Sequence, residues 1–64
     1  MISGTIKMWK EVEGWGFIEG DDGDDYFVNI TNVRIGQKLL INLRVKFDIT
    51  QGHRGPEAEN VSLF

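Results

Sequence analysis

The chain has 64 residues, which is room for one domain, so we expect a single unit over residues 1–64. It contains no cysteine, which excludes disulfides, thiolate metal sites and a cysteine nucleophile together. Seven Lys and Arg against ten Asp and Glu give a formal net charge of −3, which argues against a protein that binds duplexes through phosphates. This charge does not exclude single strands, because base stacking supplies the larger share of affinity there.

Several functional classes find no support in the sequence. No basic segment followed by an apolar run opens the chain, and no stretch approaches the roughly 20 apolar residues of a membrane helix. We therefore expect a cytoplasmic protein without membrane contact. The acidic run 21–25 lacks the spacing and the distant Glu of a calcium loop, and His53 has no carboxylate and nucleophile at a recognisable spacing. We expect no catalytic residue, no metal site and no cofactor.

In chain order, residues 2–9 predict a first strand. Strict alternation places Lys7 and Trp9 on one side of this strand and Ile6 on the core side. A core position for Trp9 stays open as an alternative, because local twist changes which way a residue faces. Residues 10–14 then predict a polar turn.

Two short β-like runs follow, residues 14–18 and 26–30, and an acidic turn with a central Asp-Gly pair separates them, which predicts an antiparallel hairpin. Period-2 alternation gives this hairpin one face with Trp15, Phe17, Phe27 and Asn29, and an aliphatic face with Ile18, Val28 and Ile30. Exposed contiguous apolar surface usually marks a binding site. A nucleobase is the partner that best suits flat exposed rings, since every base has a π-face. The alternative is a hairpin whose rings form the core.

The second half of the chain predicts two more strands. Residues 35–38 look like a turn leading into a strand, and from residue 38 to 49 apolar and polar residues alternate with one exception. This alternation favours one long strand over a helix, whose apolar residues would form two stripes. Residues 51–56 hold two glycines and the only proline and predict a turn, and residues 58–63 predict a final strand. Five short strands predict a small all-β antiparallel barrel.

These runs resemble the motifs of the bacterial cold-shock proteins. Residues 14–18, Gly-Trp-Gly-Phe-Ile, are similar to the family's first ribonucleoprotein motif, usually Lys-Gly-Phe-Gly-Phe-Ile, and residues 26–30 to the second, usually Val-Phe-Val-His-Phe. Residues 4–7 resemble its opening Gly-x-Val-Lys, and residues 52–61 its closing Gly-x-Arg-Gly-Pro-x-Ala-x-Asn-Val. The resemblance covers nearly the whole chain. It implies a five-stranded antiparallel OB-fold (Greek-key) barrel that binds single-stranded RNA and DNA.

The resemblance also implies which residues bind. Lys7 and Arg54 are expected to contact phosphates or bases, and the position of Asp25 accepts hydrogen bonds from bases in the family. The full set of expected nucleic-acid-binding residues is Lys7, Trp9, Trp15, Phe17, Asp25, Phe27, Asn29 and Arg54.

Several departures from the family fall on this expected binding surface. Met8 replaces an aromatic residue, Glu13 replaces a lysine, and Asn29-Ile30 replaces the His-x pair. The family's long loop before the fourth strand, which carries another stacking aromatic, is contracted around residues 33–37. Two hypotheses follow. The first is a sequence-tolerant single-strand binder that acts as an RNA chaperone or gene-expression regulator. The alternative is a cold-shock-like domain with weakened nucleic-acid binding, used for protein contact or self-association. We expect a monomer or a weak or swapped dimer.

Overall fold

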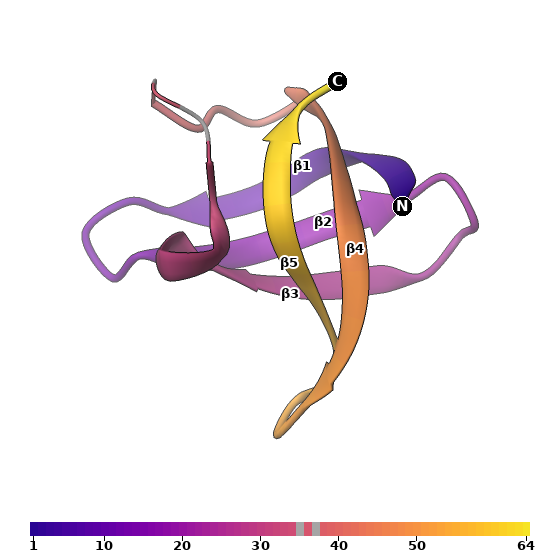
Figure 1. Cartoon of the computed structure of the whole chain (residues 1–64). Coiled ribbons are helices and arrows are strands. Elements are labelled where there is room, and N and C mark those ends of the chain that lie inside the picture. Colours follow the sequence, from indigo (N-terminus) through magenta and orange to yellow (C-terminus); the bar gives the residue numbers. More distant parts are fainter. Residues whose placement is uncertain (35, 37) are drawn as a thin grey trace.

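The computed structural model describes residues 1–34, 36 and 38–64, and it shows a closed barrel of five strands (Figure 1). The strands are β1 (Ile2–Lys10), β2 (Trp15–Gly20), β3 (Asp25–Asn29), β4 (Arg44–Gly52) and β5 (Gly55–Leu63), with a 3-10 helix, η1 (Ile30–Asn32), after β3. Neighbours around the barrel run β1-β2-β3-β5-β4, and only β3 and β5 pair in parallel. The predicted five-stranded all-β barrel is confirmed. No helix in this described part of the chain is long and apolar enough to cross a membrane.

Inward side chains from all five strands form one core cluster. Ile18 and Val28 are 0% exposed on the inner face of the β2–β3 hairpin, as period-2 alternation predicted. The ring centroids of Tyr26 and Phe47 lie 5.2 Å apart inside the barrel. The complete cluster consists of Ile6, Ile18, Tyr26, Val28, Val45, Phe47, Ala58 and Val61. In Figure 1, β4 and β5 cross steeply over β1, β2 and β3, so the two groups of strands enclose these side chains.

A β-bulge in β1 changes which of its side chains point into the barrel. Ile6 pairs with Ile18, whereas Met8 pairs with Phe17, so Lys7 is one extra residue on β1. Such a residue interrupts the alternation between the two faces of a strand. Met8 therefore lies beside Phe17 on the outer face.

Trp9 lies on the inner side of β1 because of this bulge. It pairs with Gly16 and packs, half-buried, against the core cluster. A Cβ atom on Gly16 would overlap the Met8 carbonyl group and the Trp9 ring, so the strand needs a glycine at this close approach. The prediction that Trp9 shares a face with Lys7 is wrong, since strict alternation does not continue through a bulge.

The segment before β4 differs from the predicted strand over residues 38–49. β4 begins only at Arg44. The φ angle of Asn42 is 76°, and the backbone N–H of Leu43 donates to the carbonyl oxygen of Leu40 at 3.2 Å, which makes a tight turn. The prediction was wrong because alternating apolar residues continue through the turn. The pattern contains no sign that the backbone reverses at an asparagine with a positive φ.

The turn between the last two strands is shorter than predicted. β4 continues to Gly52 and β5 starts at Gly55, so the turn consists of His53 and Arg54 instead of residues 51–56. The turn predicted over residues 35–38 depends on Ile35 and Gln37, which lie outside the described residues.

The acidic turn between β2 and β3 is tied to the barrel by side-chain contacts. The carboxylate of Asp21 accepts hydrogen bonds from Arg44 Nη1 at 2.8 Å, Arg44 Nη2 at 2.7 Å and Ser3 Oγ at 2.6 Å. These donors hold the pKa of Asp21 well below its usual range. In residues 1–34, 36 and 38–64, no group of three or more His, Cys, Asp or Glu is placed to hold a metal ion.

Tyr26 is expected to ionise unusually late. Its hydroxyl donates to Asp22 at 2.6 Å, and this hydrogen bond, together with burial, raises the pKa of the phenol from 10.0 to about 12. Because the folded-state pKa is raised, this contribution to stability is complete below about pH 10 and is lost as the pH rises through about 12. Tyr26 is the only tyrosine, so ultraviolet absorbance of the phenolate measures this group alone.

We expect Asp22→Asn to move the absorbance midpoint from about 12 toward 10. Circular dichroism over the same pH range controls for unfolding. A wild-type midpoint near 10 in a protein that is still folded would contradict the hydrogen bond.

Candidate functional site

Three aromatic rings lie together on the outer face of the β2–β3 hairpin. Phe17 pairs with Phe27 and Trp15 pairs with Asn29, so alternation directs these side chains away from the core. Trp15 and Phe27 are stacked with centroids 5.9 Å apart, while Phe17 meets Trp15 at 6.2 Å and Phe27 at 5.8 Å, edge to face. These three residues, Trp15, Phe17 and Phe27, are called the ring cluster below. Within the paired strands, from Trp15–Asn29 to Glu19–Asp25, the two faces of the hairpin are therefore as the sequence predicted.

Phe27 is more covered than the sequence suggested. The residue is 6% exposed, whereas Trp15 and Phe17 are half-buried. The guanidinium of Arg54 lies over the Phe27 ring, with Cζ 4.6 Å from the ring centroid. This distance is typical of a cation–π contact. Phe27 is not a member of the core cluster, so its cover comes from neighbours on the outer face, and the prediction of a freely exposed ring is wrong.

Two β1 residues extend this face, and neither belongs to the predicted set of binding residues. Met8 pairs with Phe17 and Lys10 pairs with Trp15 across the β1–β2 ladder. The Lys10 Nζ atom lies over the Trp15 ring, 5.7 Å from its centroid. The resemblance did signal Met8, because the family has an aromatic residue there. Lys10 gave no signal, since it fell in a segment predicted as a turn.

Lys7 and Asp25 lie at one edge of the ring cluster and pair with each other. The Lys7 Nζ atom donates to the Asp25 carboxylate at 3.0 Å, and both side chains are about half exposed. This hydrogen bond and the carboxylate charge raise the pKa of Lys7. Asp25 pairs with Glu19 across the hairpin, one outward position beyond the Phe17–Phe27 pair. The sequence predicted both residues as site residues but did not predict the ion pair between them.

Asn29 lies beside Trp15 and also ends β3. Its Oδ1 atom accepts hydrogen bonds from the backbone N–H of Thr31 at 3.0 Å and from Thr31 Oγ1 at 3.1 Å. A side chain that caps the following turn in this way stops the strand. Ile30 consequently begins η1 and is 49% exposed, so its predicted place on the inner face of the hairpin is wrong.

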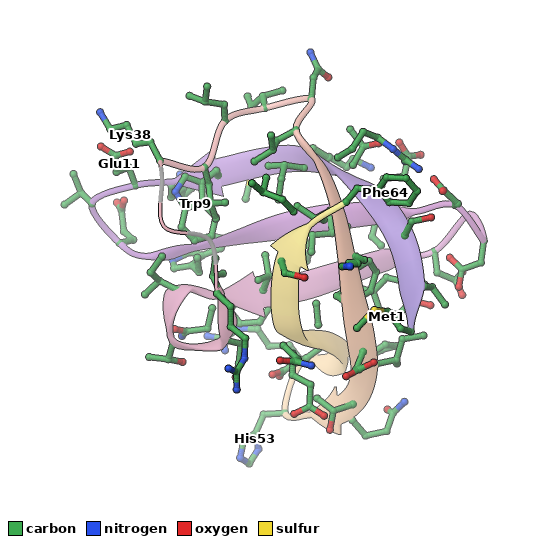
Figure 2. The ribbon with its side chains drawn as sticks, turned by 45° about the horizontal axis from the view of Figure 1, so that its top comes forward. Met1, Trp9, Glu11, Lys38, His53 and Phe64 are labelled. Atoms are coloured by element: carbon green, nitrogen blue, oxygen red, sulfur yellow. The ribbon has the colours of Figure 1, made fainter. Side chains whose placement is uncertain are left out.

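Trp9 is separated from the ring cluster by the β1 strand. Figure 2 shows it near Glu11 and Lys38, whose side chains meet with Lys38 Nζ 3.2 Å from Glu11 Oε2. The structure thus brings most of the predicted site residues to one outer surface and leaves Trp9 apart. The residues on that surface are Lys7, Trp15, Phe17, Asp25, Phe27, Asn29 and Arg54.

An open polar cleft lies elsewhere on the barrel, where η1 meets β4 and β5. Its lining residues are Thr31, Asn32, Arg34, Asp48, Glu59 and Asn60. This lining includes no aromatic residue and none of the predicted site residues, so the ring cluster remains the candidate site.

Comparisons with known proteins identify the family. The model of the family described as 'Cold-shock' DNA-binding domain matches residues 2–64. The cold shock protein of Arthrobacter globiformis is 42% identical over 66 residues, which cover 98% of this chain and 98% of that protein. The cold shock-like protein CspC of Bacillus cereus is 44% identical over 62 residues, covering 94% of this chain and 95% of that protein.

Comparison with solved structures finds the same fold in another protein. The solved structure of drosophila Unr CSD456 matches with a TM-score of 0.80 over 98% of this chain and 26% of that chain, at 22% identity, which shows a shared fold. The family match spans nearly all residues, and the barrel is the OB-fold that the motifs implied. The chain therefore belongs to the cold-shock domain family, whose members bind nucleic acids and are not enzymes.

Proposed function

We propose that this protein binds single-stranded RNA or DNA by stacking bases on the ring cluster. The observation that carries the proposal is the arrangement of Trp15, Phe17 and Phe27 on one outer face with centroids 5.8 to 6.2 Å apart. Stacking on an aromatic side chain contributes about 1–3 kcal/mol per base and is available to every base. Binding of this kind tolerates many sequences.

The polar residues around the ring cluster have complementary roles in this proposal. The Arg54 guanidinium already lies over Phe27, so it is placed to stack with a base or to meet a phosphate. Lys7, Asp25 and Asn29 offer donors and acceptors to base edges at the rim of the rings. Trp9 packs against the core cluster, and we give it no stacking role within the ring cluster.

The proposed biological role is that of an RNA chaperone or a regulator of gene expression. A base held on a ring is not available for pairing, so the protein shifts an RNA hairpin toward its open form by binding that form preferentially. No chemical step is required. The cytoplasmic location and the monomeric or weakly dimeric state remain predictions.

A fluorescence titration tests the proposal. We expect a short oligo-thymidine or oligo-uridine to quench tryptophan emission, because bases would stack against Trp15 in the half-buried ring cluster. No quenching at millimolar oligonucleotide would contradict single-strand binding. If sedimentation also changed with protein concentration, the alternative of protein contact or self-association would gain support. Leu40 and Ile41, two neighbouring apolar residues that are 61% and 60% exposed, favour that alternative most directly.

A further inference from the structure

The cations at the ring cluster differ in how they are held. Lys7 already forms an ion pair with Asp25 at 3.0 Å. Among the described residues, Lys10 and Arg54 form no ion pair, and each instead lies over a ring, with Lys10 Nζ 5.7 Å from the Trp15 centroid. The charge at Lys10 is therefore exposed and uncompensated beside the largest ring of the cluster.

We propose that Lys10 contacts the phosphate next to the base that stacks on Trp15, and this inference rests on the proposed single-strand binding. A base on the indole face brings its sugar and phosphate to the rim of the ring, within reach of the flexible lysine stem. Lys10 remains exposed to solvent, and a solvated cation over a ring is held weakly. The ammonium therefore leaves the ring face when the base arrives and forms a charge-assisted hydrogen bond with a phosphate oxygen.

Lys10 and Lys7 are expected to contribute differently to the salt dependence of binding. A phosphate must compete with the Asp25 carboxylate for Lys7, so Lys7 adds little to the release of counterions from the nucleic acid. Lys10 and Arg54 have no such competitor among the described carboxylates. Each phosphate neutralised on a single strand contributes about −0.7 to the slope of log K against log salt, so these two cations predict a slope of about −1.4.

The test compares Lys10→Gln with Lys38→Gln as a matched control. Lys38 lies at the Trp9 end of the barrel, where Figure 2 shows it beside Glu11, and its Nζ atom is 3.2 Å from that carboxylate. Both variants lose one positive charge, so they change the net charge of the protein equally. The affinity for a short oligo-thymidine is measured over a tenfold range of salt concentration, and circular dichroism verifies folding.

We expect slopes of about −1.4 for the wild type and Lys38→Gln and about −0.7 for Lys10→Gln. Over a tenfold rise in salt, the wild type then loses about five-fold more affinity than Lys10→Gln. Lys10→Arg should restore the wild-type slope. Equal slopes for Lys10→Gln and Lys38→Gln, with normal wild-type binding, would overturn the role of Lys10 and leave the proposed function intact. A wild type that binds no oligonucleotide would overturn the proposed function itself.

Discussion

Phe27→Ala is expected to weaken the binding of a short oligo-thymidine by about 5-fold to 150-fold, because stacking contributes about 1–3 kcal/mol per base. Phe27 lies within 6 Å of both other rings, at 5.9 Å from Trp15 and 5.8 Å from Phe17, and Arg54 covers it. A base reaches this ring once the Arg54 guanidinium moves off it, so the loss of Phe27 removes one stacking surface and also the ring against which Arg54 rests. Titration of the wild type and the variant under identical salt measures the effect.

The stability of Phe27→Ala should fall less than its affinity. Phe27 is outside the core cluster, and the space left by its ring opens toward the outer face, where Arg54 can move into it. Because neighbouring atoms can fill this space, the free energy of unfolding should fall by less than it does when a closed cavity is left in a core. If Phe27→Ala bound the oligonucleotide as tightly as the wild type, stacking on the ring cluster would be wrong.

Phe47→Ala should have the largest effect on stability, and it is the matched substitution on the inner face. Phe47 is 0% exposed and packs against Tyr26 with ring centroids 5.2 Å apart. Truncation of a phenylalanine in a sealed core costs about 3–5 kcal/mol. A chain of this length has a total free energy of unfolding of roughly 3–10 kcal/mol, so the variant should be largely unfolded or melt far below the wild type.

Thermal unfolding of Phe47→Ala and Phe27→Ala, followed by circular dichroism, compares one chemical change on the two faces of the barrel. The midpoint should fall much further for Phe47→Ala. Should Phe27→Ala unfold the protein while Phe47→Ala leaves it intact, the two faces would be assigned the wrong way round.

The β2–β3 hairpin was predictable because nothing interrupts its alternation. Its register runs without a shift from the Trp15–Asn29 pair to the Glu19–Asp25 pair, so period 2 gave both faces correctly. The inward positions of Ile18 and Val28 follow from the same regularity. Where a strand is continuous, the side-chain pattern of the sequence is sufficient.

The face of β1 was not predictable in this way. The extra residue at Lys7 shifts its register by one, which brings Met8 outward and Trp9 inward. Local alternation contains no signal for a bulge, because a bulge is set by the pairing with β2. The turn at Asn42 escaped prediction for a similar reason, since its positive φ interrupts an apolar pattern that looks continuous in the sequence.

The sequence and the family resemblance predicted both the rings and the charged residues of the candidate site, but not the contacts that the charged residues make. The side chains of Trp15, Phe17 and Phe27 share a face because of strand periodicity, which the sequence contains. The placement of Arg54 over Phe27 depends on the β4–β5 turn, which reaches β3 only through the closure of the barrel. Contacts of this kind depend on the tertiary fold, so residue spacing alone does not predict them.

The most direct test of stacking on the ring cluster is the oligo-thymidine titration carried out on Trp9→Phe and Trp15→Phe, because each variant keeps one of the two tryptophans. Trp15 belongs to the ring cluster, whereas Trp9 packs against the core from the other side of β1. We predict that the oligonucleotide quenches the emission of Trp9→Phe and leaves that of Trp15→Phe nearly unchanged. Quenching of Trp15→Phe alone would contradict stacking on the ring cluster, since the bases would then lie against Trp9.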